Sequence, residues 1–373
     1  MRTIKDEKKR IRRLDWIRVI SCIMVFLYHL NILKGGYLAV CTFFVLSGYL
    51  SCSSALNNSN FSIKKYYKKR IIKLYIPLVF VVAITVITSK IMKNIIWMNL
   101  KQETISAFLG YNNFWQLKAN LDYFTRHTNS PFMHLWYISI LIQFDLAFPL
   151  FYFFFKKVDE KYKKNVSVIV AFLVSILLTI IFLWMSIRKS IMFVYYNTFT
   201  RLFSIVYGVL LALILHKYDV KIPKKLMKNN KIIFRIYALI LIIMGICVSN
   251  KANNYAIYMI IVSLISVRLI RYANFEKAKR RSNFIDRVIS AIAKFSYEIY
   301  LIQYPIIFLM QNIINNEILK AVIIMIFTFI ISYLIHMVLN KKLANRAFNV
   351  VKKCSIRINN NYKLFYSDSR KRL

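Results

Sequence analysis

The residues best suited to chemistry lie in the first long apolar segment of the chain. Asp15 and Arg18 stand at its start and His29 stands near its far end. Arg18 and His29 are eleven residues apart, which in a helix places both side chains on one face, about 16 Å from each other. An imidazole is well suited to take a proton from a hydroxyl group near neutral pH. The alternatives are a snorkelling anchor for Arg18 and an interhelix hydrogen bond for His29.

Two further motifs follow along the chain. The stretch Phe43–Tyr49 contains the pair Ser47-Gly48, which permits a close approach of two helices. Arg70 and Lys73 open the next apolar segment, one helical turn apart. Two cations on one face are suited to binding a phosphate, although ordinary anchoring at the membrane surface is an equal alternative.

Later segments also carry polar residues inside apolar sequence. His134 and Trp136 open the fourth segment, which contains Asp145 further on. Arg201 lies near the middle of the sixth segment, so it must face the interior of a helix bundle and needs a partner. Asp145 is the nearest carboxylate by depth, and we predict that it pairs with Arg201. The ninth segment places Tyr297, Glu298, Tyr300 and Gln303 within three helical turns. His336 lies near the end of the tenth segment, and we interpret it as an ordinary contact between helices.

The elements that must hold these residues are membrane-spanning helices. The chain of 373 residues is 58% hydrophobic with a mean hydropathy of +0.50, and its apolar residues form blocks of about twenty, the length that crosses a bilayer. We therefore expect an all-α polytopic membrane bundle of about ten transmembrane helices. The predicted spans are 15–34, 36–56, 72–92, 133–155, 165–186, 190–215, 232–250, 254–270, 288–314 and 318–340.

The charge distribution predicts the orientation of this bundle. The formal net charge is +41, and most of the 55 Lys and Arg residues fall in loops that the ten spans place on one side. The positive-inside rule assigns that side, with both termini, to the cytoplasm beside anionic lipid, and argues against nucleic acid as a partner. We expect a basic N-terminus over 1–14, a transmembrane domain over 15–340 and a basic cytoplasmic tail over 341–373. The loop 93–130 lies on the other side, as an interfacial helix or a cap over a pocket.

The five cysteines lack the spacing of a metal site or of a disulfide framework. We interpret them as small apolar residues. We expect no bound metal and no bound cofactor. The basic start runs into a span too long for a signal peptide.

The joint order of the motifs resembles the integral membrane acyltransferase-3 family. Its opening Asp-x-x-Arg and Arg-x10-His signature is similar to Asp15, Arg18 and His29, and its Phe-Phe-Val-Leu-Ser-Gly-Phe segment to Phe43–Tyr49. The later matches are Arg70 to Pro77, His134 to Trp136, Arg201 with Gly208, and Ser296 to Pro305. The likeness extends from residue 13 to about 340. Lys73 stands where the family often has Arg, Gln303 where many members have His, and Leu141 where one subset has Glu. Leu141, together with the expectation that no soluble domain is fused to the chain, indicates a resemblance to the short stand-alone subset.

The resemblance implies roles for the matching residues. His29 is expected to be the catalytic base or a transient acyl carrier. Arg18 is expected to orient the acyl-CoA co-substrate and Arg70 to help hold its phosphates. The other residues expected to bind donor or acceptor are Asp15, Lys73, His134, Trp136, Arg201, Tyr297 and Tyr300.

We therefore expect a multi-pass acyltransferase of the cell membrane that moves an acyl group, acetyl in the first instance, from acyl-CoA to a hydroxyl of a surface or cell-wall glycan. Proteins of glycan synthesis are possible partners. Two rivals remain at this point: an exporter of a glycan or lipid-linked glycan, and a non-catalytic scaffold that recruits a glycan synthase. A transferase consumes acyl-CoA, whereas an exporter does not. A non-catalytic scaffold tolerates a substitution of His29, whereas a transferase does not.

Overall fold

The computed structural model describes residues 11–58, 60–92, 97, 99–121, 130–162, 166–218, 229–249, 254–275, 283–310, 313 and 315–339. All regular structure in these ranges is helical. The predicted tail over 341–373 and the first ten residues lie outside them. The helices are α1 (Arg12–His29), η1 (Gly36–Leu38), α2 (Ala39–Leu56), α3 (Ile63–Arg70), η2 (Ile71–Tyr75), α4 (Ile76–Ile91), α5 (Leu100–Leu109), α6 (Asn112–Lys118), η3 (Met133–Leu135), α7 (Trp136–Tyr162), α8 (Val166–Arg188), α9 (Ile191–Tyr196), α10 (Thr198–Lys217), α12 (Asn230–Cys247), α13 (Tyr255–Asn274), α14 (Phe284–Ile292), α15 (Ser296–Met310) and α16 (Glu317–Val338).

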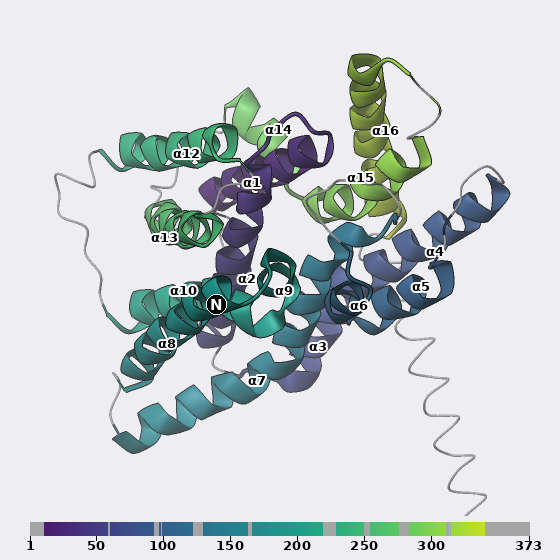
Figure 1. The fold of residues 1–373 in the computed structure, drawn as a ribbon. Coiled ribbons are helices and arrows are strands. Elements are labelled where there is room, and N and C mark those ends of the chain that lie inside the picture. The colour runs from purple at the N-terminus through teal and green to yellow at the C-terminus, as the bar shows by residue number, and fades with distance from the viewer. Residues whose placement is uncertain are drawn as a thin grey trace, which may run out of the picture.

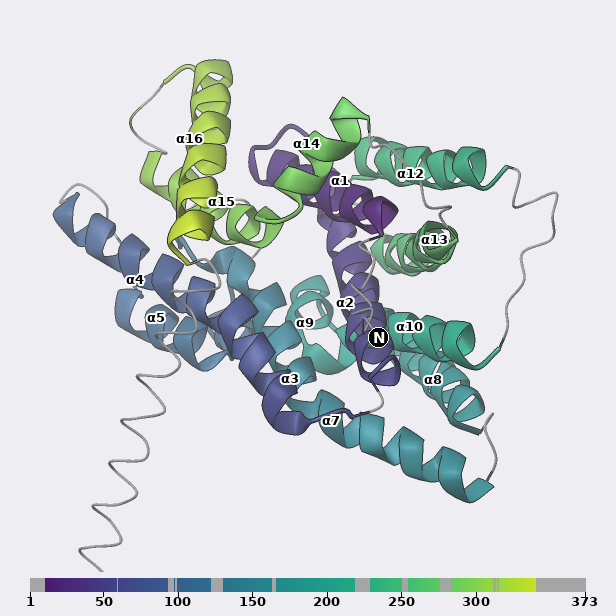
Figure 2. The ribbon, with the colours of Figure 1, turned by 180° about the vertical axis from the view of Figure 1, so that it is seen from behind.

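The predicted all-α membrane bundle is confirmed. Within the described ranges, eight helices are long and apolar enough to cross a membrane. The other two predicted spans are also helical: α1 carries charged residues near its start, and α15 has only fifteen residues. In Figures 1 and 2, α2 runs through the middle of the molecule, with α8, α10 and α13 on one side and α3 to α6 on the other.

Two predicted spans are broken in the structure. The sixth divides into α9 and α10 at Asn197, whose side chain accepts a hydrogen bond from the backbone N–H of Phe199. This bond caps α10, so Arg201 lies in its first turn and not near the middle of a span. The ninth divides into α14 and α15 between residues 293 and 295. The third instead extends back to Ile63 as one continuous helical run with a π-helical stretch, Ile71–Tyr75.

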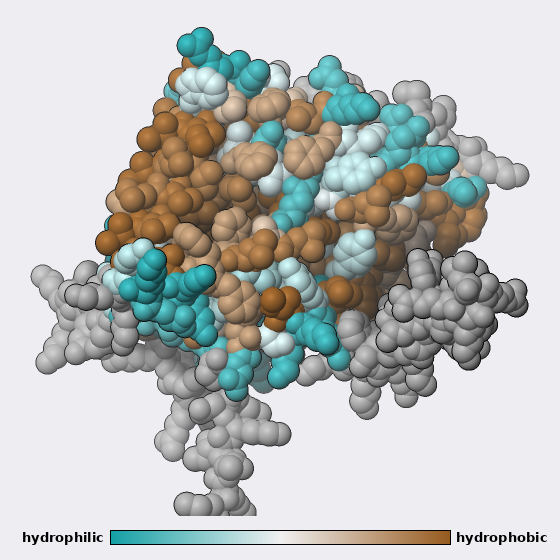
Figure 3. All heavy atoms as spheres, turned by 90° about the horizontal axis from the view of Figure 1, so that it is seen from below, coloured by the Kyte–Doolittle hydropathy of each residue, from teal (hydrophilic) through white to brown (hydrophobic). Residues whose placement is uncertain are grey.

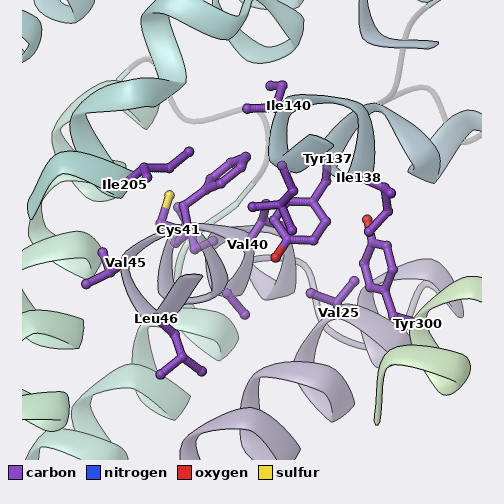
Figure 4. Packing of buried hydrophobic residues seen from close by; sticks show 14 of the residues in the cluster. Val25, Val40, Cys41, Val45, Leu46, Tyr137, Ile138, Ile140, Ile205 and Tyr300 are labelled. Carbon is purple, nitrogen blue, oxygen red and sulfur yellow. The ribbon is translucent and has the colours of Figure 1, made fainter. Parts of the chain in front are cut away.

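The centre of the bundle depends on a close contact between α2 and α10. A Cβ atom added to Gly48 would lie 2.0 Å from the carbonyl oxygen of Ile205, and one added to Gly208 would lie 1.9 Å from that of Val45. Any side chain at either position would overlap backbone. Figure 4 shows Ile205 against the Cys41 and Val45 side of α2, with Tyr137 and Tyr300 on the other side. The packing role expected for the Ser47-Gly48 pair is therefore the one that the structure shows for Gly48.

The segment expected as an interfacial helix or a cap forms a helical hairpin of α5 and α6. Its turn has Gly110 at φ 72°, a left-handed conformation that glycine adopts without strain. Gln143, two turns into α7, donates to the Gly110 carbonyl at 3.0 Å and to Asn113 Oδ1 at 2.9 Å. The turn therefore packs beside the body of α7, where Gln143 satisfies the Gly110 carbonyl.

The outside of the bundle is largely apolar. Figure 3 shows broad hydrophobic areas bordered by clusters of hydrophilic residues on the face seen from below. Large exposed hydrophobic side chains cover the outer faces of α8 and α16, among them Leu177, Trp184, Ile326 and Phe327. Such a surface is stable against hydrocarbon and not against water.

Candidate functional site

Four aromatic side chains from three elements meet at one end of the bundle, here called the histidine end. They are His29 at the C-terminus of α1, His134 in η3, and Tyr300 and Tyr304 of α15. The His29 and His134 ring centroids are 6.2 Å apart, and the Tyr304 ring lies 4.9 Å from His29 and 5.3 Å from His134. His29 is 9% exposed and His134 is fully buried. The structure thus brings the two predicted histidines together.

The main chain of α15 and the side chain of His134 hold each other in place. His134 Nε2 lies 3.0 Å from the carbonyl oxygen of Leu301. The Tyr300 hydroxyl donates to the carbonyl oxygen of His134 at 2.7 Å. The Tyr304 ring stacks on the imidazole with an interplanar angle of 21°. These contacts fix both the position and the orientation of the ring.

The α5–α6 hairpin supports the turn before His134. Gln116 donates to the carbonyl oxygens of Phe132 at 3.3 Å and Met133 at 2.8 Å. Glu103 accepts hydrogen bonds from Ser130 Oγ and, at 2.8 Å, from Trp97 Nε1. The Glu103 carboxyl group is fully buried, and loss of hydration raises its pKa to about 7.

Arg201 lies in an aromatic cage next to the same end. Its guanidinium lies over the rings of Tyr195 at 4.9 Å, Trp136 at 5.4 Å and Phe44 at 5.6 Å. Nη1 contacts Met259 Sδ at 2.7 Å and Nη2 contacts Cys41 Sγ at 3.8 Å. The side chain is fully buried, and cation–π contacts are strongest when they are desolvated.

The predicted pairing of Arg201 with Asp145 is wrong. The helix break at Asn197 places Arg201 in the first turn of α10, beside the first residue of α7, Trp136. Asp145 lies nine residues further along α7, which is about 13 Å along a helix. The prediction was wrong because it placed Arg201 near the middle of a membrane span, at about the same depth as Asp145.

Asp145 instead pairs with Arg70. Arg70 Nη2 lies 3.1 Å from Asp145 Oδ1, and the Tyr66 hydroxyl donates to the same oxygen at 2.8 Å. Arg70 also contacts Ser51 Oγ, and its side chain keeps 29% exposure. Lys73 is exposed and lies in the π-helical stretch. Since a π-helix has more residues per turn than an α-helix, the spacing of a regular helix does not apply to this pair.

Arg18 and Asp15 form a second ion pair. The region that contains this pair and the Arg70–Asp145 pair is here called the arginine end. Arg18 Nη1 lies 3.3 Å from Asp15 Oδ1, and Ser290 Oγ donates to Asp15 Oδ2 at 3.1 Å. The Asp15 carboxylate is buried, whereas the Arg18 side chain is 31% exposed. The carboxylate thus orients the partly exposed Arg18 side chain.

A stripe of tyrosines on α15 connects the two ends. Tyr297, Tyr300 and Tyr304 lie on one face of the helix, since they are three and four residues apart. The Tyr297 hydroxyl donates to the carbonyl oxygen of Leu74 at 2.9 Å, near the arginine end. Tyr137 of α7 lies 5.3 Å from Tyr300 between their ring centroids. Hydroxyl-bearing aromatic rings therefore follow one another along α15, from the contact of Tyr297 with Leu74 to the contact of Tyr304 with His29.

An apolar groove of about 1050 Å³ adjoins the arginine end. Arg70 and Asp145 lie at its polar part, and Leu74, Val79 and Leu109 are among its apolar lining residues. In the part of the chain that the structure describes, no three or more His, Cys, Asp or Glu side chains gather as a metal site.

Sequence reasoning missed several residues of this arrangement. Tyr304 is one, although its position four residues after Tyr300 placed it on the same face. Tyr66, Glu103 and Gln116 gave no signal, because each contributes through contacts with residues distant in sequence. Glu298, which the sequence placed near the site, pairs with His336 at 2.9 Å.

Comparison with known proteins gives a family and several relatives. A family model described as an acyltransferase domain matches residues 11–337. The O-acetyltransferase OatA of Staphylococcus aureus (strain NCTC 8325 / PS 47) is 29% identical over 304 residues, 79% of this chain and 50% of its own length. The peptidoglycan O-acetyltransferase OatA of Listeria monocytogenes is 29% identical over 353 residues, 89% of this chain and 56% of its own. The chain spans about half the length of these curated relatives. No solved structure gives a significant match.

Proposed function

Because the chain belongs to the acyltransferase family, a multi-pass membrane family, we propose that it transfers an acetyl group from acyl-CoA to a hydroxyl of a cell-wall glycan. The relatives named O-acetyltransferase and peptidoglycan O-acetyltransferase support the acetyl group and the kind of acceptor. The observation that carries the proposal is the location of His29. It lies in a buried cluster with a second imidazole, about 16 Å along α1 from Arg18.

The donor is proposed to approach the arginine end, which the positive-inside rule assigns to the cytoplasm. The phosphates of acyl-CoA meet the guanidinium groups of Arg18 and Arg70 and the ammonium group of Lys73. Both arginines keep about a third of their side-chain surface exposed, and an arginine fork suits phosphate oxygens. The thioester then extends along Tyr297 and Tyr300 to His29.

The acceptor approaches from the histidine end, past His134 and Trp136. His29 takes the proton from the glycan hydroxyl, and the oxygen attacks the thioester carbonyl carbon. The tetrahedral intermediate collapses with loss of the CoA thiolate, which receives the proton from His29. A route through an acyl-His29 intermediate uses the same residues in two steps, in which the imidazole first attacks the thioester. In either route Asp15 orients Arg18, and Arg201 holds Trp136 beside the site.

The experiment measures O-acetyl groups on the host's cell-wall glycan by mass spectrometry. It compares the wild type, a deletion strain, and deletion strains that express His29→Gln or the matched control His216→Gln. His216 is exposed on α10 and touches no part of the cluster. We expect the deletion and His29→Gln to lose acetyl groups and His216→Gln to keep them, at equal protein levels. Unchanged acetylation in the deletion, with glycan accumulating inside the cell, would favour the exporter instead.

The donor is tested on the purified protein in lipid vesicles. Transfer from acetyl-CoA releases one CoA thiol for each acetyl group moved, so a thiol reagent follows the reaction directly. We expect thiol release that requires both His29 and added cell-wall glycan. Acetylation in cells without acetyl-CoA consumption by the vesicles would refute the acyl-CoA donor and keep the transferase.

A further inference from the structure

The hydrogen bonds of His134 define which of its nitrogen atoms carries a proton. Nε2 lies 3.0 Å from the carbonyl oxygen of Leu301. A carbonyl oxygen only accepts hydrogen bonds, so Nε2 carries the hydrogen and donates it. In the neutral imidazole the other nitrogen, Nδ1, then has a lone pair and acts as an acceptor.

This acceptor is buried and has no donor among the described residues. The His134 side chain is fully buried, and Nδ1 has no hydrogen-bond partner within the parts of the chain that the structure describes. The ring cannot turn to find one, because Leu301 holds Nε2 and Tyr304 stacks on its face. Buried acceptors in folded proteins are nearly always paired, so an oriented acceptor beside His29 indicates a ligand that brings the donor.

We propose that Nδ1 of His134 accepts a hydrogen bond from a sugar hydroxyl of the glycan acceptor, beside the hydroxyl that His29 deprotonates. This inference rests on the proposed function and adds the recognition of the acceptor to it. The His29 and His134 ring centroids are 6.2 Å apart, within reach of one sugar residue that offers two hydroxyl groups. The ligand class is therefore a polyhydroxylated sugar.

The proposal gives the two histidines different tasks. His29 exchanges a proton with the substrate, whereas His134 keeps its neutral form throughout and serves as a hydrogen-bond acceptor. A buried acceptor of this kind rejects an analogue that lacks the matching hydroxyl, because the acceptor then stays unpaired. His134 thus determines specificity for the sugar, and its loss weakens use of the acceptor more than use of acyl-CoA.

Two amide substitutions separate this task from a structural one. In His134→Asn, the Oδ1 atom takes about the position of Nδ1 and keeps the acceptor, but the bond to Leu301 is lost. In His134→Gln, the side-chain NH₂ group takes about the position of Nε2 and keeps the bond to Leu301, but the acceptor is lost. Thermal unfolding of the purified variants is therefore expected to show His134→Gln at least as stable as His134→Asn.

The activity is expected to follow the opposite order. In the deletion strain, at equal amounts of protein in the membrane, His134→Asn is expected to keep about tenfold more O-acetyl groups on the cell-wall glycan than His134→Gln, the size of one such hydrogen bond. His134→Phe, which has neither nitrogen, is expected to show no more than the Gln variant. Equal activity of Asn and Gln, a higher activity of Gln, or full activity of all three variants would overturn the proposal.

The failure of this proposal is distinguishable from failure of the proposed function. If deletion of the gene leaves the acetyl content unchanged, the transferase function itself is wrong. If deletion removes the acetyl groups and His29→Gln fails to restore them, but the Asn and Gln variants of His134 show the reverse order, only the acceptor role of His134 is wrong.

Discussion

The two ends of the bundle hold polar groups in different ways. At the histidine end, His134, Arg201 and Glu103 are fully buried, and backbone carbonyls, aromatic rings and hydroxyl groups surround them. At the arginine end, Arg18 and Arg70 pair with carboxylates and keep about a third of their side-chain surface exposed. One end is closed and rigidly packed, whereas the other has charges that a ligand can reach.

The difference matches the two tasks that the proposed function assigns to the two ends. A closed, oriented site suits the chemical step, since preformed hydrogen bonds need no rearrangement as the reaction proceeds. An exposed ion pair suits the binding of an anionic donor, because its arginine can add a phosphate contact at little cost in desolvation. If this comparison is right, substitutions at the histidine end affect stability most, and substitutions at the arginine end affect donor binding.

The largest effect is expected from Arg201→Ala at the histidine end. The change removes three cation–π contacts and leaves a cavity beside Trp136, at a cost of about 3 kcal/mol or more. Thermal unfolding of the purified protein in detergent measures this loss. The matched control is Arg188→Ala, at an exposed arginine at the end of α8, which is expected to shift stability by less than about 0.5 kcal/mol. Similar shifts for both variants would contradict the closed cage.

A pH effect of similar size is expected from Glu103. Its pKa is raised from 4.5 to about 7 by burial, so between these two pH values the folded state holds a proton that the unfolded state has lost. The stability of the fold then decreases as pH rises from 4.5 to 7, by up to about 3 kcal/mol. Below pH 4.5 this contribution of Glu103 is present in full.

The pH dependence of unfolding in wild type and Glu103→Gln checks this expectation. The Gln variant cannot ionise and is expected to lack the decline between pH 4.5 and 7. Glu160→Gln, at an exposed residue of α7, serves as the control and is expected to keep the wild-type slope. A wild-type slope in Glu103→Gln would mean that another group titrates in this window.

Much of the bundle was predictable from sequence because apolar length and positive charge are local signals. All ten predicted spans coincide with helices, and His29 and His134 were both among the predicted site residues, although the contact between them was not predicted. The breaks were harder to predict. The cap at Asn197 and the interruption before Ser296 lie inside spans that average hydropathy predicts as continuous, because a few polar residues change such an average little. One misjudged helix start was enough to assign Asp145 to the wrong arginine.

The support of the site was not predictable for a different reason. Gln116 bonds to carbonyl groups sixteen and seventeen residues away, and Leu301 receives its bond from His134, 167 residues earlier. Any polar side chain of suitable length looks the same in the sequence, and only the three-dimensional arrangement selects these pairs. The segment of the α5–α6 hairpin was therefore predicted only as an interfacial helix or a cap over a pocket, without the residues that support His134.

A smaller effect, about tenfold, is expected from Arg70→Gln at the arginine end. Loss of one phosphate contact is expected to raise the KM for acetyl-CoA about tenfold, which corresponds to about 1.4 kcal/mol. The rate at saturating acetyl-CoA is expected to change little, because Arg70 is remote from His29. Thiol release in lipid vesicles at varied acetyl-CoA gives both values. Lys90→Gln, in the last turn of α4, removes the same charge and provides the control. A lower maximal rate with an unchanged KM for acetyl-CoA in Arg70→Gln would place Arg70 outside the donor site.

The smallest effects come from one substitution made at both ends, Ser139→Ala and Ser290→Ala. Ser139 Oγ accepts the backbone N–H of Asn112 at 3.0 Å in a fully packed region, so its loss leaves a buried donor unpaired and is expected to cost about 1 kcal/mol. Ser290 Oγ donates to Asp15 at 3.1 Å, and Asp15 keeps Arg18 as a partner, so the cost there is expected to be about 0.5 kcal/mol. Unfolding midpoints of both variants, measured side by side, decide whether this order is correct. A larger loss for Ser290→Ala would show that the arginine end is as tightly packed as the histidine end, and its arginines would then be structural and not available to a donor.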